Sequence, residues 1–155
     1  MTLDNILEEI KKANTIAIVV HENPDGDAIG SALAMKLALE QLNKEADVII
    51  PEYPSAFSFL PGVEEIKKES DIQEYDLAIA LDCASIKLLN GFAKYFDNAK
   101  VKVAIDHHSS NTMYADYNFI SQDSPACAQL LLVAFSYFGI EVTKEIGTCI
   151  LAGII

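Results

Sequence analysis

A buried strand followed by a turn with acidic and imidazole side chains is the feature that most constrains this chain. Residues 16–20 read Ile-Ala-Ile-Val-Val, and such a run of apolar, mostly β-branched residues is typical of a strand covered on both faces. Asn-Pro and Asp-Gly dipeptides follow and predict a sharp reversal of the chain. A helix is expected to begin at Ala28. The loop between strand and helix therefore carries His21, Asp25 and Asp27.

The rest of the chain repeats this alternation of strand and helix. Strands are expected over residues 16–20, 46–50, 77–81, 101–105 and 117–120, and helices over residues 2–13, 28–43, 64–70, 86–96, 124–139 and 144–155. Strands that alternate with helices predict an α/β fold with a doubly wound, mainly parallel sheet flanked by helices. The length suits one domain, residues 1–155, with a full hydrophobic core.

Charge and composition narrow the class of protein. A formal net charge of −12 argues against a non-specific grip on long nucleic acid, which needs a basic surface. No apolar run is long enough to span a membrane, and the amino terminus lacks the pattern of a signal peptide. We therefore expect a soluble cytoplasmic protein without membrane contact.

The three cysteines (Cys83, Cys127 and Cys149) are widely spaced and odd in number, so each is expected to be a small buried residue rather than half of a disulfide.

Three of the expected strands end in side chains that can bind a metal ion. The first is followed by His21, Asp25 and Asp27, the third by Asp82, and the fourth by Asp106, His107 and His108. In a parallel sheet these ends lie along one edge, so residues far apart in the sequence meet there. All three histidines of the chain fall at this edge.

Such a set suits metal-assisted hydrolysis of a phosphoester. Oxygen donors with a few imidazoles favour Mn²⁺, Mg²⁺ or Fe²⁺. Two such ions roughly 3.5–4 Å apart activate water and brace the phosphorus centre. A central carboxylate such as Asp82 can bridge both ions, and a histidine beside the ligands can stabilise phosphate charge or donate a proton.

Each of these features alone has a simpler interpretation. An Asp after a strand is usually a turn or helix cap, a His-His pair is more often incidental than catalytic, and an Asp-Gly-Asp loop can be a plain turn. Three such strand ends at one sheet edge are hard to explain as caps. We therefore favour the functional interpretation.

The same residues resemble a known family. His21-Glu-Asn-Pro-Asp-Gly-Asp27-Ala-Ile-Gly-Ser31, Asp82 after a buried strand, and Ile105-Asp106-His107-His108 are similar to the first three motifs of the DHH phosphoesterases, a RecJ-like superfamily. The Asn-Pro-Asp-Gly-Asp form most resembles the oligoribonuclease (nanoRNase) branch, which also removes the 3′-phosphate of phosphoadenosine phosphate. Relatives include dinucleotide phosphodiesterases, single-strand exonucleases and inorganic pyrophosphatases.

The resemblance assigns expected roles. It implies that His21 and Asp25 hold one Mn²⁺ ion, that Asp27 and His107 hold the other, and that Asp82 bridges the two. His108 is expected to contact the scissile phosphate. Asp106 is expected to orient the histidines from behind.

The sequence departs from the family's pattern in two places. Gln129 stands where relatives carry a Glu before a helix, so we assign it no role. The chain also ends at Ile155, before the fourth motif, an Asp, and before the carboxy-terminal domain that grips substrate. We expect a DHH domain truncated before that motif, impaired when it acts alone.

Two classes of function follow. The first is a Mn²⁺-dependent hydrolase, a phosphodiesterase or phosphatase, whose substrates are short RNA oligonucleotides, dinucleotides or small nucleotide phosphates. A pyrophosphatase or polyphosphatase is the alternative enzyme, and a catalytically incomplete metal- or nucleotide-binding module is the alternative that is not an enzyme. We also expect an exposed apolar patch after Ser124 that favours a homodimer.

Overall fold

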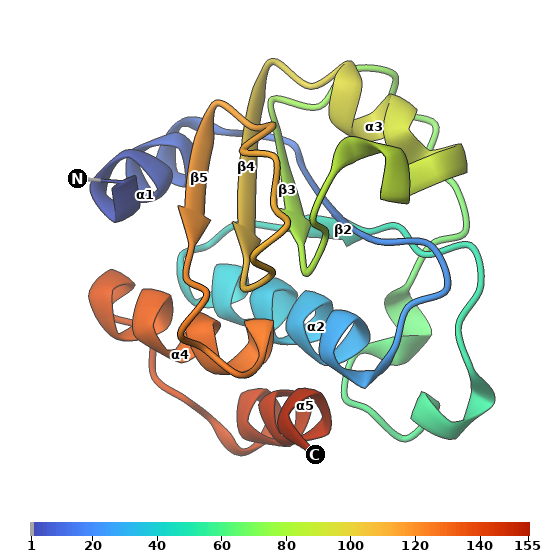
Figure 1. The fold of residues 1–155 in the computed structure, drawn as a ribbon, viewed down its shortest axis with the longest axis vertical. Helices are drawn as coiled ribbons and strands as arrows, with labels where there is room; N and C mark the ends of the chain where they lie inside the picture. The colour runs from blue at the N-terminus through green and yellow to red at the C-terminus, as the bar shows by residue number, and fades with distance from the viewer. Residues whose placement is uncertain (1) are drawn as a thin grey trace.

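Five short apolar strands form one parallel sheet, shown in the computed structural model of Figure 1, which describes residues 2–155 apart from the side chain at position 90. The strands are β1 (Ile16–Val20), β2 (Ala46–Val48), β3 (Leu77–Leu81), β4 (Val101–Asp106) and β5 (Tyr117–Ile120). They lie in the order β2-β1-β3-β4-β5, and every neighbouring pair is parallel. The predicted doubly wound α/β fold is confirmed.

The strand order places a switch point between β1 and β3. The chain leaves β1 toward β2 on one side and then continues through β3, β4 and β5 on the other. Sheets of this kind bind ligands in the crevice beyond the carboxyl ends of the strands on either side of such a point. The residues that follow β1 and β3 therefore hold the most favourable position in the fold for a site.

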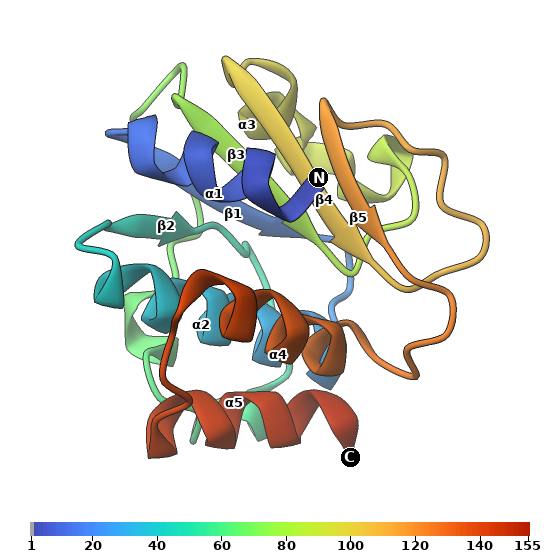
Figure 2. The same cartoon turned by 90° about the vertical axis from the view of Figure 1, so that its left-hand side faces the viewer.

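Helices cover both faces of the sheet. They are α1 (Thr2–Lys12), α2 (Gly26–Gln41), α3 (Ala93–Asp97), α4 (Cys127–Phe138) and α5 (Lys144–Ile154), with short 3₁₀ helices η1 (Ser55–Phe57), η2 (Val63–Glu65) and η3 (Ile86–Phe92). Figure 2 shows α5 outside α2 and α4, as a further layer away from the sheet.

Alternation along β1 divides the core in two. Ile16, Ile18 and Val20 belong to the larger cluster, which also includes residues of α1, α2, α4 and α5. Ala17 and Val19 belong to the smaller cluster, with aromatic residues of α3. Because both faces are covered, all five residues of β1 are buried, as expected for an internal parallel strand.

The amino-terminal end of α2 differs from the prediction. The helix begins at Gly26 rather than Ala28, because Asp25 is its N-cap and accepts a hydrogen bond from the Ala28 N–H over 3.0 Å. Asp27 therefore lies in the first helical turn and not on the loop.

Three other helix predictions differ from the structure, and the helix expected over residues 124–139 begins three residues later, at Cys127. Residues 64–70 do not form a helix: η2 ends at Glu65, and the backbone of Lys67 pairs with β2 by accepting from Ile50 N–H and donating to Val48 O, both over 2.9 Å. Lys67 must be extended because only an extended backbone can pair in this way with the free N–H and C=O groups of an edge strand. The helix expected over residues 86–96 is divided into η3 and α3 near Gly91, a residue type that weakens helices.

The three cysteines are buried and unpaired, as predicted. Burial raises the pKa of each thiol, to about 11 for Cys83 and Cys149.

Apolar side chains are exposed after Ser124, including Val133 and Tyr137 on α4. In the described part of the chain, no helix combines the length and apolar character that crossing a bilayer requires.

Candidate metal centre

The loop after β1 and the start of α2 bring three predicted ligands to the sheet edge. The His21 ring is held by its Nδ1, 2.8 Å from the carbonyl oxygen of Glu22. Its Nε2 lies 3.5 Å from Asp82 Oδ2 and 3.8 Å from Asp25 Oδ1. One imidazole nitrogen is thus used to orient the ring, and the other faces two carboxylates.

Asp82 occupies the centre of this edge, directly after β3. Its side chain is 2% exposed, and its backbone adopts a left-handed conformation with φ of 57°. Asp and Asn tolerate that region better than most residues do. The conformation occurs where β3 ends, so the strand stops and the carboxylate is presented at the same point.

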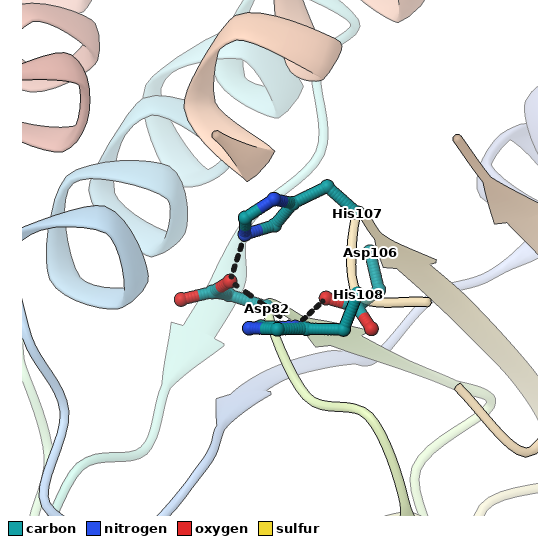
Figure 3. A group of neighbouring side chains, drawn as sticks. All are labelled: Asp82, Asp106, His107 and His108. Carbon is teal, nitrogen blue, oxygen red and sulfur yellow. Dashed lines mark hydrogen bonds and ion pairs between the residues drawn. The ribbon is translucent and has the colours of Figure 1, made fainter. Parts of the chain in front are cut away.

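The last residue of β4, Asp106, and the two histidines that follow it complete the edge (Figure 3). His107 Nε2 lies 3.1 Å from Asp82 Oδ1 and 3.4 Å from Asp27 Oδ2. His108 Nδ1 lies 2.7 Å from Asp106 Oδ1 and 3.9 Å from Asp82 Oδ1. Asp106 is fully buried, whereas 43% of the His108 side chain is exposed. His108 is therefore the member of the pair that is open to a ligand.

Asp27 is held by groups outside this set. Its two carboxylate oxygens accept hydrogen bonds from the N–H groups of Cys127 and Ala128, each over 2.9 Å, at the start of α4. Ser31 Oγ donates a further hydrogen bond over 3.3 Å. The N-cap residue of α4, Ala126, has no side chain that can cap, so Asp27 supplies this function from a hundred residues away.

The electrostatics of the edge reflect buried acid next to imidazole. Burial raises the pKa of Asp82, against the effect of its hydrogen bond with His21. The same contact with Asp82 raises the pKa of His21 to about 9. Among the described residues, the ion pairs that these carboxylates make have histidine as the only basic partner.

The structure brings all seven residues singled out in the sequence to one edge, where Asp27 joins the others through His107, whose Nε2 lies 3.4 Å from Asp27 Oδ2. Two groups have donor atoms within 4.8 Å of one another: His21, Asp25 and Asp82, and Asp82, Asp106, His107 and His108. Asp82 belongs to both groups. Oxygen and imidazole nitrogen atoms of this kind suit Mn²⁺, Mg²⁺ or Fe²⁺.

Sequence reasoning missed two polar residues here. Ser31 ends the first motif and has no expected role, yet its hydroxyl donates a hydrogen bond to Asp27. Asn111 stood in a polar loop with no pattern to mark it, yet it contacts Asp106. Gln129, to which we assigned no role, is exposed.

Two relatives named for nuclease and phosphatase activity match most of this chain. The chain is 32% identical over 153 residues to the Thermus thermophilus protein named bifunctional oligoribonuclease and PAP phosphatase NrnA, covering 97% of this chain and 46% of that protein. A Streptococcus mutans protein named as a probable NrnA is 22% identical, covering 97% and 47%. The chain thus spans a little under half the length of these relatives.

Solved structures share the fold. A Bacteroides fragilis protein titled exopolyphosphatase-related is 25% identical with a TM-score of 0.92, covering 99% of this chain and 48% of that one. Exonuclease RecJ, solved bound to manganese, is 15% identical with a TM-score of 0.52, covering 96% and 40%, and shows likeness of fold alone. The profile of the DHH family, N-terminal domain, matches residues 15–154. This chain therefore belongs to the DHH family.

Proposed function

We propose that this chain carries the metal centre of a phosphoesterase that hydrolyses short oligoribonucleotides or dinucleotides, and phosphoadenosine phosphate. One observation supports the proposal above the others. The two carboxylate oxygens of Asp82 face different partners: Oδ2 faces His21, and Oδ1 faces His107. A carboxylate divided in this way is suited to hold two cations side by side.

The donor set fits two divalent ions. His21 and Asp25 lie on one side of Asp82, and Asp27 and His107 lie on the other. We assign one ion to each side, with Asp82 between them, and Mn²⁺ as the preferred metal over Mg²⁺ or Fe²⁺. When bound, such a pair supplies Lewis-acid activation of water and charge stabilisation at phosphorus.

His108 is the residue that contacts the substrate, and Asp106 orients it. The Asp106 carboxylate accepts a hydrogen bond from the Nδ1–H of His108, which leaves the other ring nitrogen free for a phosphate oxygen or the leaving group. Asp106 is buried, so it contacts the histidine rather than the substrate. The partly exposed ring of His108 is available to a phosphate at the mouth of the site.

Short nucleotides are the favoured substrate class. The Thermus thermophilus relative is named for oligoribonuclease and PAP phosphatase activities. The net charge of −12 suits a short substrate better than a long strand. Polyphosphate or pyrophosphate is the second candidate, because the Bacteroides fragilis structure with the same fold is titled exopolyphosphatase-related.

The half of each NrnA relative that this chain does not match is relevant to the activity expected of the chain. Because this chain matches about half of each NrnA relative, we propose that groups in the other half complete substrate binding. Activity of the 155-residue chain alone is then low. The cytoplasmic location and the homodimer stay predictions.

The test is hydrolysis of a diadenylate and of pyrophosphate, with and without Mn²⁺. The 155-residue chain is compared with a chain extended through the region that corresponds to the relatives' second half. We expect Mn²⁺-dependent cleavage of diadenylate that is faster in the extended form. Cleavage of pyrophosphate alone supports the second candidate, and Mn²⁺ binding without hydrolysis of either substrate contradicts both.

The variant His108→Asn tests the assignment of roles. Loss of a general acid or base lowers kcat by a factor on the order of 10²–10⁴. We expect that loss with Mn²⁺ affinity retained. The matched variant His107→Asn is expected to lose Mn²⁺ affinity as well, and equal effects of the two on metal binding contradict the division of roles.

A further inference from the structure

The side chain of Asn111 joins the ends of β3 and β4 behind the two histidines. Its Nδ2 donates to Asp106 Oδ2 over 2.9 Å and approaches the carbonyl oxygen of Cys83 at 3.4 Å. Its Oδ1 accepts from the Met113 N–H over 2.7 Å. One amide therefore contacts the residue after Asp82, the buried carboxylate of the His-His segment and its own loop.

The two oxygens of Asp106 are divided between two partners. Oδ1 lies 2.7 Å from His108 Nδ1, and Oδ2 accepts from Asn111. Because Asp106 is fully buried, removal of the amide leaves one carboxylate oxygen with no replacement from bulk water. The carboxylate is then free to rotate, and its alignment with the histidine is lost.

We propose that Asn111 is a positioning residue: it holds Asp106 so that the His108 Nδ1–H donates its hydrogen bond to that carboxylate and the other ring nitrogen faces the substrate. The inference rests on the proposed role of His108. Asn111 is the third residue in a chain of hydrogen bonds that begins at His108 and passes through Asp106. A partner behind a catalytic or ligating side chain typically changes affinity or activity by about 10- to 100-fold.

Other contacts hold the same loop in place. The Tyr114 hydroxyl donates to the carbonyl oxygen of Cys83 over 2.8 Å, and the Thr112 N–H donates to the carbonyl oxygen of Ala84 over 2.9 Å. The Tyr114 ring also packs against Phe96, with ring centroids 5.4 Å apart. The loop thus has anchors that survive loss of the Asn111 amide, which separates a positioning role from a purely structural one.

The chain offers a matched control in Asn118. Its amide makes two hydrogen bonds, accepting from the Ala115 N–H over 3.1 Å and donating to the Ala115 carbonyl over 2.9 Å. Like Asn111 it is partly buried. It lies on β5, and both hydrogen bonds return to Ala115 just before that strand, so it braces the same segment without a hydrogen bond to the histidines.

The experiment compares Asn111→Ala, Asn111→Asp and Asn118→Ala in the extended chain of the hydrolysis test, labelled with ¹⁵N-histidine. Asn111→Asp keeps the shape of the side chain and the acceptor for Met113, but it replaces the donor to Asp106 and to the Cys83 carbonyl with a carboxylate oxygen that repels Asp106. The first readout is the Nδ1–H signal of His108 without substrate. The second is the split between kcat and KM on a diadenylate with Mn²⁺.

We expect both Asn111 variants to lose the sharp Nδ1–H signal and to lower kcat by about 10- to 100-fold with KM little changed. Asn118→Ala is expected to lower the melting temperature without moving either readout. An unchanged His108 signal in both Asn111 variants, or the same loss in Asn118→Ala, overturns the inference. Absence of hydrolysis by the wild type contradicts the proposed function instead, because the magnetic resonance readout needs no substrate.

Discussion

Two clusters of charged side chains in this molecule look alike in the sequence but differ in how their charge is balanced. One is the metal edge, the residues after β1, β3 and β4. The other, the β2-edge cluster, lies beside the edge strand and consists of Lys36, Glu40, Asp47, Glu65 and Lys67. The β2-edge cluster lines a hollow of about 570 Å³, so the size of a hollow does not identify the functional site.

The β2-edge cluster supplies its own cations. Lys36 Nζ lies 2.8 Å from Glu65 and 3.0 Å from Glu40, and Lys67 Nζ lies 2.9 Å from Asp47. Burial lowers the pKa of Lys36, but its hydrogen bonds with the two glutamates outweigh this effect and raise it overall. The network joins η2 to α2 and is complete without a ligand.

The metal edge places its carboxylates next to imidazoles instead. Asp82 and Asp106 are almost fully buried, and their ion pairs in the described structure are with histidines. A buried carboxylate is costly unless it is paired or bound to a metal. Both clusters contain several carboxylates, so their number does not distinguish the two. The distinguishing feature is that the carboxylates of the metal edge have no lysine or arginine partner in the described structure, so that this edge needs a cation from outside.

The largest effect is expected from Asp82→Asn. Asparagine has the same shape and tolerates the left-handed backbone at this position, so the fold is retained. We expect Mn²⁺ affinity to fall by more than about 100-fold, beyond the usual cost of losing an outer partner. Calorimetric titration with Mn²⁺ measures the affinity, and circular dichroism checks the fold. Wild-type affinity in the variant would break the comparison, because Asp82 would then be as dispensable as a surface acid.

A smaller effect is expected from Gly153→Ala, which tests how Asp27 is held. A Cβ atom at this position would lie 2.5 Å from Ala128 Cβ and 3.1 Å from Asp27 Oδ1. The substitution must therefore displace the start of α4 or the carboxylate itself. We expect Mn²⁺ affinity to fall by about tenfold, as for other residues that orient a ligand.

Gly147→Ala is the matched control on the same helix. A Cβ atom there meets no heavy atom within 4 Å, so only the helix propensity changes. We expect a gain in stability of about 0.5–1 kcal/mol and unchanged Mn²⁺ affinity. Titration and thermal melting of both variants separate the effects. Equal affinities of the two variants would show that close packing at Gly153 does not position Asp27.

The sequence predicted the metal edge because its signals are local. A run of β-branched residues marks each strand, and a parallel sheet then brings His21, Asp82 and His107 together without further information. The start of α2 was missed by two residues, although the Asp25 N-cap was readable from residue type. The burial of the three cysteines followed from their odd number and wide spacing.

What the sequence could not predict depends on distant partners. Residues 64–70 carry charges at helical spacing, but Lys67 is held extended by backbone hydrogen bonds to β2. Asn111 is one polar residue in a polar loop, and its importance appears only when β3 and β4 lie side by side. The cap that Asp27 provides for α4 likewise joins residues a hundred positions apart. A pattern of neighbouring residues cannot predict hydrogen bonds between residues that are far apart in the sequence.

The smallest effect is expected from Lys36→Met, which tests the other half of the comparison. Methionine has a similar length and suits the buried stem of the side chain, which is 10% exposed. Glu40 and Glu65 are about half exposed, so both recover water when the ammonium is removed. We expect a change in the free energy of unfolding of at most about 1 kcal/mol, as for exposed ion pairs, and unchanged Mn²⁺ affinity. Chemical denaturation and metal titration measure the two quantities. A fall in Mn²⁺ affinity would show that the β2-edge cluster is coupled to the metal edge through α2, and the two clusters would then form one functional unit.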